Sequence, residues 1–125
     1  MTIDIQDLTK TIVGSLTGLV EGDITDYVDF AEKQTKALAK QAAWIASTAV
    51  VPFGTEGGFD DREELDWFLE NLEKMSSNFV KTIIALTIIT LEKAWNAIVG
   101  AIWSAINGVV QPVLGVALPV PGARI

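Results

Sequence analysis

The side chains best suited to chemistry form a run of five carboxylates, Asp60, Asp61, Glu63, Glu64 and Asp66. Paired carboxylates act as general acid and general base when an apolar pocket raises the pKa of one of them. No such pocket is indicated around this run, which stands at the expected start of a helix. Acidic residues at that place stabilise a helix by capping it and by compensating its dipole. We therefore interpret the run as a helix start and not as an active site.

Other residues and motifs that commonly carry catalysis are missing from the sequence. It has no histidine and no cysteine, which removes the commonest general base, the thiol nucleophile and the best ligands of transition metals. The glycine-rich stretch 54–58 lacks the lysine and the preceding strand of a phosphate-binding loop. No nucleophile elbow and no calcium-binding loop occurs. We therefore expect a protein that is not an enzyme and that uses no cofactor and no metal.

The charged residues argue against a protein that wraps nucleic acid. The formal net charge is −7. The basic cluster Lys33, Lys36 and Lys40 stands beside three acidic residues, Asp26, Asp29 and Glu32. Binding to phosphates requires clustered basic residues without acidic neighbours. We interpret the cluster as a solvated helix face of mixed charge.

The front of the sequence has the apolar spacing of amphipathic helices. Residues 1–22 form a first segment, in which Gly14 and Gly18 give the Gly-x-x-x-Gly spacing that lets membrane helices approach closely. The stretch Thr11–Val20 that contains them is too short to span a bilayer, at about ten residues against the roughly 20 required. A second helix is expected over 23–51, followed by a loop over 52–59 that starts with Pro-Phe-Gly.

A very long helix is predicted over 60–111, because neither glycine nor proline interrupts the sequence between the loop and Gly100. Asp60 and Glu63 at its start resemble a capping box. Such a helix would be on the order of 75 Å long, so we expect a bend near Glu92 or an elongated assembly. Apolar residues in its first part follow the three-four alternation of a coiled coil. This predicted seam consists of Leu65, Phe68, Leu72, Met75, Phe79, Leu86 and Ile89.

The last part of this helix, apolar from about residue 82, has three faces on a helical wheel. From Thr82 onward only Glu92, Lys93 and Arg124 are ionisable. Alanines and glycines form one face, beside a narrow uncharged polar stripe and a broad apolar face. The polar stripe consists of Asn96, Gly100, Ser104, Asn107 and Gln111. The broad apolar face includes Trp95, Ile98, Ile102, Trp103, Ile106 and Val109.

An uncharged polar stripe next to small residues is typical of helices that pack inside a membrane or line a wet lumen. The uncharged run 94–118 is long enough to span a bilayer, although Pro112 would interrupt it. The alternative is a helix buried in an oligomeric bundle, with the stripe hydrogen-bonded between subunits. Under both interpretations we expect more apolar surface after Lys93 than one chain can cover by itself.

The tail, residues 112–125, contains prolines that prevent a helix at its end, and it is too apolar for free disorder. We expect an extended arm that docks into a groove on a neighbouring copy. The whole chain is then a single all-α domain. Its expected architecture is an elongated helical hairpin or bundle with one very long or kinked C-terminal helix and an extended C-terminal arm.

A chain without cysteine, with a charged helical front and a Gly/Ala/Ile/Trp-rich helix over 94–111, resembles the small internal virion (ejection) proteins of short-tailed bacteriophages. Members of that class are stored in the particle, leave it ahead of the genome and assemble into a conduit through the host envelope. The resemblance implies a homo-oligomer located in the virion and then in the host cell envelope. Its implied partners are other virion proteins and membrane lipid, with passage of nucleic acid that is not specifically bound.

The resemblance also implies roles for the faces of the last helix. Bulky residues such as Ile102 and Ile106 would face lipid or neighbouring protein, and the polar stripe would face a lumen or the next subunit. Three other functions stay open: a structural virion ring or adaptor without membrane contact, a holin-like or toxin-like pore former, and a helical scaffold. Asp4 and Asp7 make the N-terminus unlike a secretory signal, so we expect any membrane contact without the standard export route.

Overall fold

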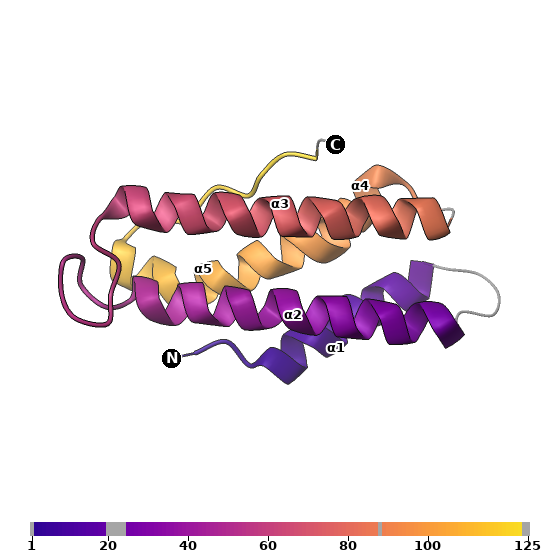
Figure 1. Ribbon diagram of the computed structural model, residues 1–125, viewed down its shortest axis with the longest axis horizontal. Coiled ribbons are helices and arrows are strands. Elements are labelled where there is room, and N and C mark those ends of the chain that lie inside the picture. The colour runs from indigo at the N-terminus through magenta and orange to yellow at the C-terminus, as the bar shows by residue number, and fades with distance from the viewer. Residues whose placement is uncertain (1, 20–24, 88, 124–125) are drawn as a thin grey trace.

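The computed structural model describes residues 2–19, 25–87 and 89–123, and every regular element in them is a helix. Four helical stretches lie side by side and alternate in direction, which confirms the predicted all-α bundle (Figure 1). The first three are α1 (Ile5–Leu19), α2 (Thr25–Ala49) and α3 (Arg62–Leu86). The last helix, Leu91–Leu114, consists of α4 (Leu91–Trp95), the π-helical turn η1 (Asn96–Gly100) and α5 (Ala101–Leu114).

α1 is the amphipathic helix expected within residues 1–22. Leu8, Ile12 and Leu16, spaced by four residues, are buried in the bundle. Gly14 and Gly18 are exposed on the other side of the helix. A Cβ added at either glycine would meet no described atom of another element within 4 Å. The Gly-x-x-x-Gly spacing therefore makes no close helix contact in this bundle.

α2 brings small side chains to the core, because Ala39, Ala42 and Ala46 are fully buried. Small residues let neighbouring helices approach α2, which contacts α1, α3 and α5. The loop after α2 is tightly folded: a Cβ at Gly58 would stand 2.9 Å from the carbonyl oxygen of Pro52. Only glycine fits there, so the loop conformation is built into the sequence.

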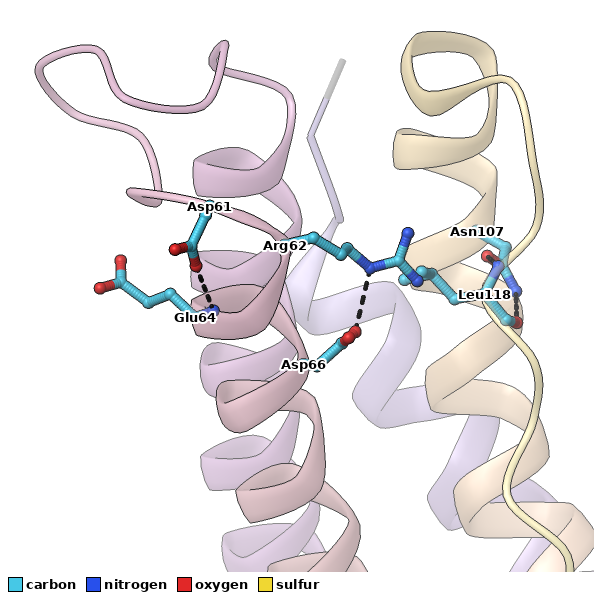
Figure 2. Close-up of polar contacts among 6 residues, drawn as sticks. All are labelled: Asp61, Arg62, Glu64, Asp66, Asn107 and Leu118. Atoms are coloured by element: carbon cyan, nitrogen blue, oxygen red, sulfur yellow. Dashed lines mark hydrogen bonds and ion pairs between the residues drawn. The ribbon is translucent and has the colours of Figure 1, made fainter.

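α3 begins one residue later than the capping pattern predicts. The Asp61 carboxylate accepts a hydrogen bond from the backbone N–H of Glu64 at 2.9 Å (Figure 2). In return the Glu64 carboxylate accepts one from the backbone N–H of Asp60 at 3.2 Å. The pair resembles a capping box, except that the return bond reaches the residue before the N-cap Asp61. The predicted pair of Asp60 and Glu63 was therefore wrong, although the helix start was placed correctly to within two residues.

The buried face of α3 also differs from the predicted coiled-coil seam. Met75 and Leu86 are 43% and 60% exposed, so their assignment to the seam was wrong. Ser76 is buried in place of Met75, because its hydroxyl donates to the Leu72 carbonyl at 2.8 Å and so needs no water. Of the other seam residues, Phe68 is half-buried and Leu65, Leu72, Phe79 and Ile89 are buried. The additional buried residues of α3 are Leu69, Val80 and Ile83.

The predicted long helix over 60–111 is two helices, because the chain reverses between α3 and α4 (Figure 1). Thr87 ends α3 in an extended conformation, and its hydroxyl donates to the carbonyl of Ile83 at 2.7 Å. Thr90 caps α4, since its hydroxyl accepts from the backbone N–H of Lys93 at 3.4 Å. The reversal lies just before the place where a bend was expected. It converts a long rod into a compact bundle.

The last helix continues through Pro112 to Leu114, beyond the predicted end at residue 111. Proline has no N–H to donate, but near a helix end this removes only one hydrogen bond. Gly115 ends the helix in the left-handed conformation, with φ at 79° and its N–H bonded to the Gln111 carbonyl at 2.8 Å. Residues 118–123, called the arm below, then run back along the bundle in extended form (Figure 1).

Candidate functional site

The apolar face of the last helix is covered within a single chain. Apolar side chains of α1, α2 and α3 pack over it. For this face the expectation that one chain cannot cover its apolar surface was therefore wrong, because the other three helices cover it. Further along the chain, Val113, Val116 and Val120 stay exposed. In this structure the face contacts protein. Its predicted residues are all between 0% and 6% exposed: Trp95, Ile98, Ile102, Trp103, Ile106 and Val109.

The π-helical turn keeps this face buried along the whole helix. Ala94, Ile98, Ile102 and Ile106 are fully buried at intervals of four residues. In a regular α-helix four residues turn by about 400°, so such a row drifts by about 40° at each step. The wider turn of η1 offsets the drift. Both halves of the apolar face consequently pack against one core.

The predicted polar stripe lies on the outer surface with one exception. Asn96, Ser104 and Gln111 are exposed, and Gly100 is half-buried between its neighbours. Asn107 is half-buried and binds the arm. In a single chain the exposed part of the stripe faces solvent. Its place at a lumen or between subunits stays a prediction.

The arm is held on the last helix by three hydrogen bonds and one buried side chain, which together are called the clasp below. The Asn107 amide donates to the Leu118 carbonyl at 2.9 Å and accepts from the Leu118 N–H at 2.7 Å (Figure 2). The Trp95 indole N–H donates to the Pro121 carbonyl at 2.8 Å. The Leu118 side chain is 2% exposed. The arm thus docks on its own chain in this structure, where docking on a neighbouring copy was expected.

An open hollow of about 300 Å³ separates the arm from α3. Arg62 and Asp66 of α3 line it, joined by an ion pair of 3.0 Å, and Pro119 and Pro121 line it from the arm (Figure 2). The arm is therefore attached firmly on the side of the last helix and loosely on the side of α3.

Sequence analysis missed a group of aromatic side chains where α2 and α3 pack near their shared loop. Trp44 contacts Phe68 and Phe59 edge-on, with ring centroids 4.9 and 5.7 Å apart, and Trp67 contacts Phe68 at 4.8 Å. Such edge-on contacts favour fixed ring positions. Trp44 and Trp67 nevertheless stay 46% and 58% exposed. One feature of the sequence indicates them: each of the two predicted helices carries a tryptophan, Trp44 or Trp67, on its polar side.

Further exposed apolar side chains belong to the same end of the bundle, where α2 ends, α3 begins and α5 ends (Figure 1). Large exposed apolar groups on one surface often mark a contact with protein or membrane. The exposed apolar side chains of the segments at this end are together called the apolar end below: Trp44, Phe53, Trp67, Val113 and Val116.

The titratable groups that the structure describes do not form an active-site constellation. Asp61 and Glu64 act as helix caps, and Arg62 and Asp66 form an exposed pair one helical turn apart. No group of three potential metal-ligating side chains gathers among the described residues. Burial raises the pKa of the Tyr27 phenol, whose hydroxyl has no hydrogen-bond partner among the described residues. These positions are explained by helix capping, ion pairing and packing.

The last helix is, among the described residues, the one helix that is long and apolar enough to cross a membrane. Its 24 residues have a mean hydropathy of 1.6 in the most apolar window. The core helix of a soluble bundle has the same properties, so they are compatible with both environments. Comparison of this chain with protein-family models, with curated proteins and with solved structures finds no match. Its function is therefore argued from its own geometry.

Proposed function

We propose that this chain is a non-enzymatic, self-assembling virion protein of the ejection type. The bundle is then the storage form, and the last helix leaves it to become part of a conduit for genome delivery through the host envelope. One observation carries the proposal: the apolar face of a 24-residue helix is buried against three amphipathic helices that carry most of the charged residues.

The last helix fits the interior of a bilayer as well as a protein core. Its 24 residues extend about 36 Å, against about 30 Å for the hydrocarbon layer. Its charged side chains, Glu92 and Lys93, stand in the first turn, where they would reach the headgroups. Bulky residues such as Ile102 are favourably placed in both environments.

Transfer into lipid favours association of several copies. Asn96, Ser104 and Gln111, which are exposed to water in the bundle, would need hydrogen-bond partners in hydrocarbon. Neighbouring helices supply such partners through uncharged polar groups and small residues. A lumen lined by these groups does not hold phosphate, and the chain has a net charge of −7. Nucleic acid would therefore pass without specific binding.

A purely structural virion ring or adaptor is the second candidate. It is favoured by the complete coverage of the apolar face, because a helix that is already buried needs no membrane. Its contact surface would be the apolar end, where Trp44 and Trp67 are half exposed. A holin-like or toxin-like pore former would use the same last helix but act from inside the producing cell.

Brominated acyl chains test the membrane step, because they quench only the indoles that enter hydrocarbon. Replacing Trp44 and Trp67 by phenylalanine leaves the two buried indoles as reporters. The matched variant with Trp95 and Trp103 replaced leaves the two exposed ones. On vesicles of phosphatidylethanolamine and phosphatidylglycerol, after partial unfolding in mild acid, we expect the buried pair to be quenched.

The other outcomes of this experiment separate the alternatives. Quenching confined to Trp44 and Trp67 would mean surface docking without insertion of the last helix. No quenching in either variant would refute the membrane step and favour the structural ring. Production in the bacterial cytoplasm tests the holin-like function: we expect an intact inner membrane, whereas leakage of a cytoplasmic enzyme would favour a pore former that acts from inside.

A further inference from the structure

The contacts of the clasp can form within one copy of the chain or between two copies. The arm runs antiparallel to the last helix, because Leu118 is bound by Asn107 while the later Pro121 is bound by the earlier Trp95. On the arm, the bonded groups are backbone atoms and the one buried side chain is that of Leu118. Every copy of the chain carries the same arm and the same receiving helix. The contacts are therefore identical whether the arm binds its own helix or that of another copy.

The connection between helix and arm is lightly held. Gly115, Val116 and Ala117 are exposed. The hydrogen bond that the structure shows at this connection is the one from the Gly115 N–H back to Gln111, which belongs to the helix end. Glycine adopts left-handed and extended conformations with similar ease. A change at Gly115 can thus swing the arm outward, which withdraws the Leu118 side chain from the core.

A straightened connection fixes where a second copy would lie. The arm would continue in the direction of its own helix, and the helix that receives it must run in the opposite direction. Two antiparallel helices that exchange arms in this way are related by a two-fold axis. The two bundles then meet at the ends where their last helices stop. That is the apolar end, so the direction of the arm and the exposed apolar side chains point to the same surface.

We infer that two copies of this chain exchange their arms around a two-fold axis, each arm entering the clasp of the other copy. The exchange keeps the three hydrogen bonds and the buried Leu118, and it additionally covers Trp44, Trp67 and Val113 at the apolar end. This inference rests on the self-association in the proposed function and deepens it by naming the contact. It concerns assembly in solution, because the last helix of each copy stays inside its own bundle.

Shortening the connection tests the exchange. Deleting Val116 and Ala117 leaves too little chain for the arm to fold back onto its own helix, but an arm that continues straight can still enter another copy. By light scattering we expect the natural chain to dimerise as its concentration rises, and the deletion variant to be a dimer throughout. The same deletion combined with Asn107→Ala and Leu118→Ser should be monomeric. A deletion variant of unchanged helicity that stays monomeric overturns the inference.

A second measurement does not depend on the deletion variant. Val120 is 51% exposed, so a photoreactive benzophenone side chain there leaves the docked arm in place. Copies labelled with light and with heavy nitrogen are mixed at high concentration, irradiated and digested. Crosslinks that join the arm of one isotope to the last helix or α3 of the other support exchange. Crosslinks found only within copies, or a chain that is monomeric at every concentration, overturn it.

The two proposals fail in distinguishable ways. Crosslinks only within copies, together with lipid quenching of Trp95 and Trp103, would refute arm exchange and leave the membrane step standing. Hybrid crosslinks without any lipid quenching would support exchange and refute insertion. The latter result would favour the structural ring.

Discussion

Asn107→Ala is the sharpest test of the clasp, since this side chain makes two of its three hydrogen bonds. A hydrogen bond of this kind contributes about 1 kcal/mol net, so the pair contributes about 2 kcal/mol. The higher helix propensity of alanine offsets about 0.5 kcal/mol of that loss. We expect the free energy of unfolding to fall by about 1.5 kcal/mol. The free energy with which the arm docks is the upper limit of this fall. Once the arm detaches, its contacts are all lost and stability falls no further.

Urea denaturation followed by circular dichroism measures this loss, and indole fluorescence reports the arm. Detachment leaves the Trp95 N–H to water, so the emission of a chain retaining only this indole should shift to the red. Asn96→Ala is the matched control, because Asn96 lies on the same stripe, is exposed and shows no side-chain hydrogen bond in the described structure. Its stability should change by less than about 0.5 kcal/mol. Equal losses in the two variants would refute the reasoning.

Three further predictions concern the bundle itself. Asp61→Ala removes the cap of α3 and should lower the urea-derived free energy of unfolding by about 1 kcal/mol. Leu72→Ala, which empties a buried site, should lower it by about 2–5 kcal/mol, while Met75→Ala on the exposed side lowers it by less than about 1 kcal/mol. Equal losses at these two positions would mean that Met75 packs in the core with Leu72, as the predicted coiled-coil seam requires. Burial raises the pKa of Tyr27, so the unfolded chain loses the phenol proton first and stability falls as the pH rises past about 10. Tyr27→Phe should reduce that alkaline loss, as seen by comparing urea midpoints at neutral and alkaline pH, and an unchanged loss would contradict this origin.

Features set by local periodicity were predictable from the sequence. α1 and α2 were expected from apolar residues three and four apart, and the faces of the last helix followed from the same period. Ile102 is accordingly buried and Asn96 exposed. The reversal between α3 and α4 was not predictable in this way. It uses the hydroxyls of Thr87 and Thr90 on nearby backbone groups, and threonines make similar bonds inside uninterrupted helices.

Features set by tertiary contacts had no local signal. Burying Met75 or burying Ser76 both preserve a three-four spacing in α3, and the neighbouring helices decide between them. The clasp joins Asn107 to a residue beyond the end of its helix, and helical periodicity does not predict such a contact. The exposed indoles Trp44 and Trp67 share Phe68 only because α2 and α3 pair in opposite directions. The coverage of the apolar face was misjudged because it depends on all three other helices at once.

The π-helical turn determines where the last helix can gain or lose a residue. Leu91, Ala94 and Ile98 face the core with one three-four spacing, and Val99, Ile102 and Ile106 follow another. The two series meet at Ile98 and Val99, inside the turn. The second series is displaced by one residue, so the turn acts as one inserted residue. Losing one residue there would leave a regular α-helix with the same side chains directed inward. The same loss elsewhere would rotate the remainder of the helix by about 100°. One turn thus absorbs an insertion or deletion that the rest of the helix would not tolerate.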